Sequence, residues 1–289
     1  MKRLQLILVL LVACISMSHA QLLWKITGKG LKEPSYIFGT HHLIPIQFLD
    51  SIHGLYPAFN SAKTVVSELV LNNIDASPKI QKAALLPDTV TIQSLLSKAD
   101  YDFANEEIKN TMRMSLDNMN KMHPSLIATI YELGVYKTSA HFDENTKSDS
   151  YFQLVAAQKG IPVVGLETVD KQIDLLFPKD LKKEAQRLVE TVRNKTILIK
   201  ELTEMNSLYR CGNIDELEKL SEQSNTQWKI SDEESKAMID DRNIEWVKQL
   251  PDLMKKNSCF VAVGALHLPG INGVLHLLKK EGYKVTAVK

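Results

Sequence analysis

Two histidines occupy the same position in a short motif that occurs near each end of the chain. Residues 38–45 are Phe-Gly-Thr-His-His-Leu-Ile-Pro, and residues 263–270 are Val-Gly-Ala-Leu-His-Leu-Pro-Gly. Each copy has the form G-x-x-H-Leu and directly follows a short apolar segment that predicts a strand. A glycine at the end of a strand permits a sharp turn, after which the imidazole of His42 or His267 can point back over the edge of the sheet. We therefore expect the two motifs to face one site at the carboxyl ends of strands.

Two glutamates occupy comparable places in other apolar segments. Glu68 lies within residues 64–71, which predict a short buried strand, and Glu167 follows the apolar residues 161–166. Burial of an unpaired carboxylate is costly. Glu68 therefore either pairs with a cation such as Arg242 or a lysine, or belongs to the site. Glu167 either belongs to the site or caps the helix that follows it.

Two histidines and one or two carboxylates, delivered from strand ends, are a donor set for Zn²⁺, Mn²⁺ or another transition metal. Such a set leaves open positions for water, whose pKa the metal lowers. The alternative is that both histidines are hydrogen-bonded structural residues, which is the commoner role of a lone histidine on an apolar element. Spacing alone leaves both alternatives open.

Other catalytic signatures are absent from the sequence. It contains no G-x-S-x-G, H-E-x-x-H, C-x-x-C, P-loop or G-x-G-x-x-G motif. Serine hydrolase, zincin, nucleotide-binding and dinucleotide-binding functions therefore lose their best support. The 35 Lys and Arg residues balance 34 Asp and Glu residues, so no basic excess favours nucleic acid as a partner.

Residues 1–20 have the pattern of a secretory signal peptide. Lys2 and Arg3 precede a short apolar block, and Ser18-His19-Ala20 has the small-x-small form of a cleavage site. We expect cleavage after Ala20 and export to the periplasm or the extracellular space. The block is too short for a membrane span, which needs about 20 residues, and no later segment approaches one.

A lipobox is the alternative interpretation of the same segment. Residues 11–14 are Leu-Val-Ala-Cys, which would make Cys14 the lipid-anchored end of an exported lipoprotein. Two further cysteines, Cys211 and Cys259, remain after cleavage. Cys259 opens an apolar segment and is expected to be a buried free thiol.

Apolar segments near both ends predict strands, and the middle of the chain predicts helices. Strands are expected at residues 22–27, 35–38, 64–71, 161–166, 259–263 and 284–288. Helices are expected at residues 100–120, 124–139, 151–158, 178–206, 214–227 and 232–250. No linker rich in Pro, Gly or Ser divides the chain. We predict that residues 21–289 form a single α/β domain, α+β in character, with a mixed sheet from both chain ends and long helical insertions.

The sequence resembles the TraB/GumN family, which includes the Tiki metalloproteases. The resemblance covers nearly the whole mature chain and rests on residues 36–42 (Tyr-Ile-Phe-Gly-Thr-His-His), 66–69 (Val-Ser-Glu-Leu), 165–168 (Gly-Leu-Glu-Thr), 241–246 (Asp-Arg-Asn-Ile-Glu-Trp), 260–270, 272–274 and 282–283. The block at 260–270 is the most specific of these.

This resemblance implies a metal-dependent hydrolase whose active centre combines the paired G-x-x-H motifs with a glutamate. It points to His42, His267 and Glu68 as ligands of a divalent transition metal (Mn, Co or Zn), with Glu68 also catalytic. Arg242 would stabilise negative charge on the substrate or transition state, and Glu167 would be a second catalytic carboxylate. His41 replaces an apolar residue of the family, so it either adds a ligand or lines the pocket.

The leading functional prediction is a secreted metal-dependent peptidase acting on a peptide or protein. The alternative is an exported binding protein that sequesters a peptide or haem without turnover. A role in surface polysaccharide production is suggested by the family name alone, since the sequence has no sugar-site signature.

Overall fold

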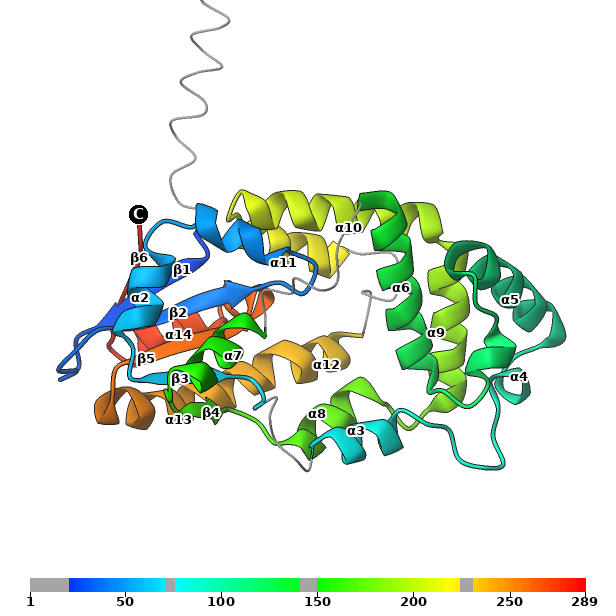
Figure 1. The fold of residues 1–289 in the computed structure, drawn as a ribbon, viewed down its shortest axis with the longest axis horizontal. Helices are drawn as coiled ribbons and strands as arrows, with labels where there is room; N and C mark the ends of the chain where they lie inside the picture. The colour runs from blue at the N-terminus through cyan, green and yellow to red at the C-terminus, as the bar shows by residue number, and fades with distance from the viewer. Residues whose placement is uncertain (1–20, 71–75, 141–149, 224–230) are drawn as a thin grey trace, which may run out of the picture.

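The sheet combines strands from both ends of the chain, as predicted. The computed structural model describes residues 21–70, 76–140, 150–223 and 231–289, so the predicted signal peptide and Cys14 lie outside the described residues. Strand order is β4-β3-β5-β2-β1-β6 (Figure 1). The strands are β1 (Leu23–Thr27), β2 (Ser35–Thr40), β3 (Thr64–Ser67), β4 (Val163–Gly165), β5 (Cys259–Gly264) and β6 (Lys284–Ala287). The predicted α/β class and the mixed sheet are confirmed.

Four adjacent strands are parallel, and their carboxyl ends share one edge of the sheet. β3 pairs in parallel with both β4 and β5, and β5 with β2, whereas β1 runs antiparallel to β2 and to β6. Thr40 lies beside Gly264, and Ser67 lies beside Ala262, so these strands end nearly level with one another. Segments that follow them are therefore brought together at that edge, where sites form in parallel sheets.

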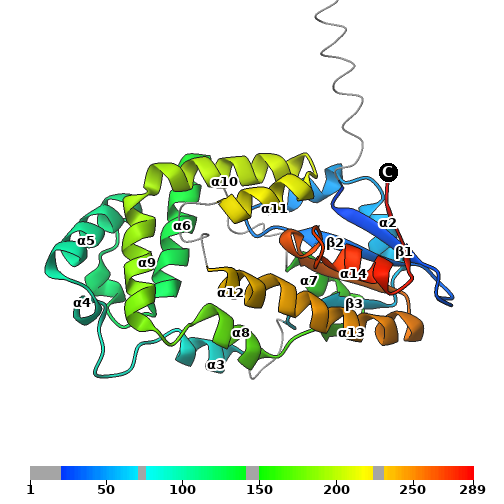
Figure 2. The ribbon, with the colours of Figure 1, turned by 180° about the vertical axis from the view of Figure 1, so that it is seen from behind.

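Helices cover both faces of the sheet. Helices α2 (Leu55–Ser61) and α7 (Tyr151–Gln158) lie on one face, and α13 (Asp241–Lys256) and α14 (Val274–Lys280) on the other (Figures 1 and 2). An aromatic cluster fixes the first face: the ring of Phe152 on α7 lies 5.5 Å from that of Phe38 and 4.8 Å from that of Phe260. On the strands, the side chains of Phe38 and Phe260 alternate with those that face α13 and α14, because successive side chains of a strand point to opposite faces.

A second hydrophobic cluster lies among the helices inserted between the strands. It is built from α4 (Ile92–Leu95), α5 (Lys98–Met112), α6 (Pro124–Ala140), α9 (Leu181–Arg193) and α10 (Lys195–Arg210). Helix α10 belongs to both clusters: Leu198 and Leu202 pack in the helical cluster, and Met205 and Tyr209 pack against the sheet. One continuous helix therefore joins the two cores (Figure 1).

Several expected boundaries were wrong, each for a local reason. β3 ends at Ser67, so Glu68 follows the strand and does not lie inside it. Helix α5 stops at Met112, because Arg113 adopts a left-handed conformation with φ of 62°. The helix expected at 178–206 is interrupted at Asn194, and the one expected at 232–250 contains a π-helical turn, Lys236–Asp240, between α12 (Asp232–Ser235) and α13.

The remaining helices connect these parts: α3 (Ala76–Ala83), α8 (Val169–Leu176) and α11 (Ile214–Gln223). Cys259 is a buried free thiol, as expected, and Cys211 is exposed and also free. Among the described residues, no helix combines the length and apolar character that a membrane crossing needs.

Gly39, which begins the motif at residues 39–42, is expected to tolerate no side chain. A Cβ at Gly39 would lie 2.8 Å from Leu268 Cδ1 and 3.0 Å from the backbone Cα of Ala265, in the turn after β5. Gly39→Ala should therefore lower the free energy of unfolding by about 1–3 kcal/mol, the range for overpacked cores, measured by urea denaturation.

Gly134→Ala is the matched control for this substitution. Gly134 lies inside α6, and its added Cβ would meet only the flexible side chain of Met112. Alanine is favoured over glycine in a helix by about 1 kcal/mol, so this variant should be at least as stable as the parent. Equal stability of the two variants would contradict the close packing of β2 against the turn after β5.

Candidate active site

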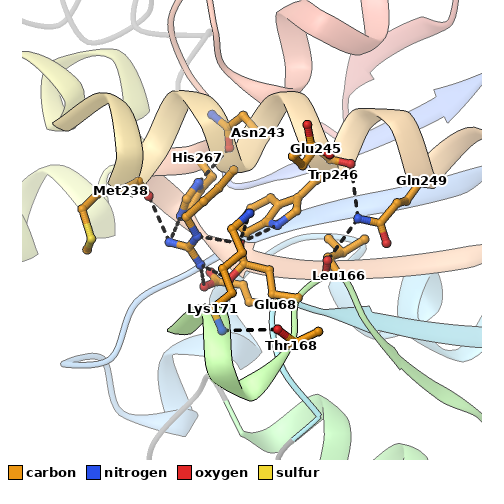
Figure 3. A network of polar contacts seen from close by, with 12 residues as sticks. Glu68, Leu166, Thr168, Lys171, Met238, Asn243, Glu245, Trp246, Gln249 and His267 are labelled. Atoms are coloured by element: carbon orange, nitrogen blue, oxygen red, sulfur yellow. Dashed lines mark hydrogen bonds and ion pairs between the residues drawn. The ribbon is translucent and has the colours of Figure 1, made fainter. Parts of the chain in front are cut away.

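A polar network that includes Glu68, Asn243, Trp246 and His267 lies at the carboxyl edge of the parallel strands (Figure 3). The guanidinium of Arg242 lies at its centre. An arginine has five N–H donors, and all five are engaged. Nε donates to Glu167 Oε1 at 2.8 Å, and Nη2 donates to Glu68 Oε2 at 2.7 Å and Glu167 Oε2 at 3.1 Å. Nη1 donates to Met238 O at 3.0 Å and lies 3.1 Å from His267 Nε2. Arg242 thus joins residues that follow three different strands.

The two glutamates differ in their access to solvent. The side chain of Glu167 is fully buried and also accepts a hydrogen bond from Trp246 Nε1 at 3.0 Å. The side chain of Glu68 keeps 26% of its surface exposed. Glu167 is not the cap of α8, because that role belongs to Thr168, whose side chain accepts from Lys171 N. Glu167 therefore anchors Arg242, and Glu68 is the carboxylate of this network that meets solvent.

Glu68 is ionised despite its partial burial. Gly264 N donates to its Oε1 at 2.7 Å, and Arg242 holds its Oε2. Burial opposes the charge, but the positive charges of His267, when protonated, and Arg242, with these hydrogen bonds, lower the pKa of Glu68 below its ordinary value. The absence of a side chain at Gly264 permits this approach, since a Cβ there would lie 3.3 Å from Glu68 Oε1.

His267 is held as a neutral imidazole with the proton on Nδ1. Asn243 Nδ2 donates to the backbone carbonyl of Asn272 at 2.9 Å, so Asn243 Oδ1 is left to accept a hydrogen bond from His267 Nδ1, 2.7 Å away. Nε2 is then unprotonated and accepts from Arg242. Burial, together with the charge of Arg242, lowers the pKa of His267 to about 4, against an opposing effect of Glu68. The neutral form of His267 therefore prevails at pH 7.

The π-helical turn Lys236–Asp240 directly precedes α13, which carries Arg242, and helps to aim that side chain. Such turns insert an extra residue into a helix and are frequent at functional sites. Here the turn supplies the carbonyl of Met238 to the guanidinium, and Asp240 accepts a hydrogen bond from Asn272 Nδ2 at 2.8 Å. The ring of Trp246, one helical turn beyond Arg242, lies 4.9 Å from the guanidinium carbon.

Helix α12, which precedes the π-helical turn and α13, forms ion pairs with helix α9 of the helical insertion. Glu234 on α12 forms ion pairs with Lys183 and Arg187 of α9, and its hydrogen bonds with Ser231 complete the capping box of α12. Although burial opposes its charge, these partners lower the pKa of Glu234 to about 2. Glu234 therefore carries its negative charge throughout the neutral pH range, and its ion pairs between α9 and α12 persist there.

The structure brings Arg242 into contact with Glu68, Glu167 and His267, all of which the sequence singled out. The network also contains Asn243, Trp246 and Asn272, to which the sequence patterns assigned no role. Arg242 and Trp246 lie four residues apart and so share one helix face, which was a usable signal. The contacts of Asn243 with His267 and with Asn272 bring together residues 24 and 29 positions apart. No local pattern reveals such a contact.

His42 and His41 both follow β2 at the same edge of the sheet. His42 is exposed. His41 shapes the turn: its Nδ1 accepts from Leu43 N at 3.0 Å, and its ring lies 5.0 Å from that of Tyr209. Tyr209 is buried and donates its hydroxyl hydrogen to Gly39 O at 2.7 Å, which fixes the start of the motif.

The residues in this arrangement do not fit a resident metal ion. Within the described ranges, no group of three or more His, Cys, Asp and Glu side chains is placed to hold one. Nε2, the nitrogen of His267 that could bind a metal, accepts from Arg242, and the same guanidinium contacts both glutamates. Metal binding by His42, His267 and Glu68 remains a prediction that requires these contacts to change.

Together, the parallel sheet and the charged network at its carboxyl edge define an α/β protein with a candidate site at that edge. The chain belongs to the TraB/PrgY/gumN family, whose model matches residues 22–287. This confirms the resemblance seen in the sequence. Comparison with curated proteins and with solved structures gave no significant match.

The protonation state of His267 is directly measurable. In a ¹⁵N-labelled sample, we expect the Nδ1–H tautomer at pH 7 and no protonation of the ring until the pH approaches 4. Asn243→Ala removes the acceptor and should change the tautomer population. A cationic His267 at pH 7, or an Nε2–H tautomer, would contradict the assigned hydrogen bonds.

Loss of Glu167 should be far more damaging than loss of an exposed glutamate. Glu167→Ala leaves the buried Arg242 and Trp246 without their shared acceptor, and breaking a buried ion pair costs about 3–5 kcal/mol. Glu245→Ala on the same helix removes an exposed pair with Lys248, for which about 0–1 kcal/mol is expected. Urea denaturation of both variants measures the difference, and a loss of similar size in both would contradict the anchoring role of Glu167.

Proposed function

We propose that the chain is an exported hydrolase that cleaves peptide bonds, with Glu68 as the residue that meets the attacking water. One observation carries this proposal. Glu68 is an ionised carboxylate with 26% of its side chain exposed, at the edge where parallel strands deliver catalytic residues. The chain's family resemblance, which points to His42, His267 and Glu68, is the second support for a site at this edge.

Glu68 has the geometry to orient and deprotonate a water molecule. Each of its oxygens accepts one hydrogen bond from the protein, from Gly264 N or Arg242 Nη2, and a carboxylate oxygen has a second lone pair. Water bound there would lose a proton to Glu68 as it attacks the carbonyl carbon, and Glu68 would return the proton to the leaving amine. Arg242 acts on this reaction through Glu68, because its own donors are already engaged.

The low pKa of Glu68 sets the expected pH dependence of this step. Glu68 must be deprotonated to act as a base, and the pKa of Glu68 lies below the ordinary glutamate value of 4.5. Activity that depends on Glu68 should therefore persist below pH 4.5, and the acidic limb of the profile should reflect the lowered pKa.

A divalent transition metal (Mn, Co or Zn) bound by His42, His267 and Glu68 forms a separate part of the sequence-based prediction that this proposal leaves out, because Arg242 already contacts His267 Nε2 and Glu68. When bound, such an ion would lower the pKa of water and polarise a carbonyl. The described geometry does not require it for the role of Glu68. Activity measured with EDTA and with each added metal tests this part independently.

Binding without turnover is the second candidate, and a specific observation favours it. Every donor of Arg242 and both ring nitrogens of His267 are engaged within the protein, so Glu68 alone in this network is placed to transfer protons. A site of this kind can hold a peptide without cleaving it. Haem is the alternative ligand of such a site, and it would give an absorbance band on reconstitution that His42→Ala abolishes.

The hydrolase proposal is tested by substitution of Glu68. Glu68→Gln keeps the shape and the hydrogen bond from Gly264 but removes the base, so peptidase activity should fall by about 10²–10⁴-fold. Residues 21–289 are incubated with a mixture of peptides of diverse sequence, and products are identified by mass spectrometry.

Glu245→Gln, an exposed change on α13, is the matched control and should retain full activity. Retention of activity by a folded Glu68→Gln protein would overturn the role of Glu68. Recovery of intact peptides bound to the parent protein, with no cleavage at any metal or pH tested, would establish the binding function instead.

A further inference from the structure

Arg242 occupies the point on which two carboxylates and an imidazole converge. Its guanidinium nitrogens lie 2.7 Å from Glu68, 2.8 Å from Glu167 and 3.1 Å from the unprotonated nitrogen of His267. We propose that Arg242 is the resident cation of this site, and that a divalent metal ion binds to His267, Glu68 and Glu167 only when the guanidinium is removed.

Charge balance supports this exclusion. Glu68 and Glu167 bring two negative charges, Arg242 brings one positive charge, and Lys171 Nζ lies 3.7 Å from Glu167 Oε1. The cluster is thus already neutral, and a divalent ion added to it would leave an excess of two positive charges beside a buried guanidinium. A metal in place of Arg242 halves that excess, from two positive charges to one.

The geometry of the ligands also supports the exclusion of a metal ion while Arg242 is in place. Zinc lies about 2.0–2.2 Å from imidazole nitrogen and carboxylate oxygen ligands. Nδ1 of His267 is committed to Asn243, so only Nε2 can coordinate, and that atom accepts from Arg242 Nη1. The ion and the guanidinium therefore compete for the same lone pairs.

Arginine is suited to permanent occupation of this position. Its guanidinium is not deprotonated in proteins, so it cannot make room for a metal by losing a proton, as a lysine can. It is also packed in place: the Arg242 side chain is only 7% exposed, Trp246 lies against it, and Met238 O accepts from Nη1. Displacement of the guanidinium would break these contacts.

Metal binding to purified residues 21–289 tests the inference without any measurement of activity. Co²⁺ and Zn²⁺ are titrated by calorimetry, and Co²⁺ coordination is followed by its visible absorption. The parent protein should show no site that depends on His267. Arg242→Met should gain about one site per chain, and Arg242→Met combined with His267→Ala should lose it.

Lys171→Met is the matched control, because it removes a neighbouring positive charge but leaves His267 Nε2 bound to Arg242. It should gain no site. A site gained equally by Lys171→Met would show that total charge, and not the position of Arg242, governs binding, and would overturn the proposal.

The parent protein decides the question even if Arg242→Met does not fold. One tightly bound metal per chain that His267→Ala abolishes would overturn the inference, since His267 would then coordinate with Arg242 present. Absence of such a site in the parent, with His267 ¹⁵N shifts unchanged on addition of Zn²⁺, would support it. These outcomes are independent of Glu68→Gln activity, so this inference and the hydrolase proposal can fail separately.

Discussion

Burial of one guanidinium constrains the whole carboxyl edge of the sheet. A charge as secluded as that of Arg242 is tolerated only when it is paired and its donors are satisfied. The fold meets this demand with acceptors from four residues, among them Glu68 after β3, Glu167 after β4 and His267 after β5. Each strand must end where it does for these side chains to reach the same group. The pKa of Arg242 is raised as a result, because the hydrogen bonds and charges of the glutamates outweigh the effect of burial.

The same network separates structural and chemical roles among residues of one type. Glu167 and Glu68 are both glutamates bound to Arg242, yet Glu167 is enclosed beneath Trp246 and Glu68 opens to solvent. His267 and His42 occupy equivalent motif positions, yet His267 is buried and neutral whereas His42 is exposed. The internal symmetry of the sequence is therefore only partly kept in the structure, and the two histidines have different surroundings.

Much of this edge was predictable because it is encoded locally. Short apolar segments ending in glycine predicted β2 and β5, and the polar residues after them marked the edge. The position of Glu68 was predicted less well, because Leu69 to Leu71 continue the apolar pattern although the strand ends at Ser67. The π-helical turn and the contacts of Asn243 depend on which distant segments meet, so neither periodicity nor composition reveals them. The packing of Arg242 against His267 was equally hidden, and it changes the chemistry expected of the site.

Helix α10 has a thermodynamic consequence for the molecule. Leu202 and Met205 lie less than one helical turn apart, yet they belong to different hydrophobic cores. Unfolding of α10 in one core would also disturb the residues of α10 that pack in the other core, so the unfolding free energies of the two cores are not independent. The hydroxyl of Tyr209 on the same helix holds the carbonyl of Gly39. The cooperative unit of folding thus extends from the helical insertion to the turn that carries His42.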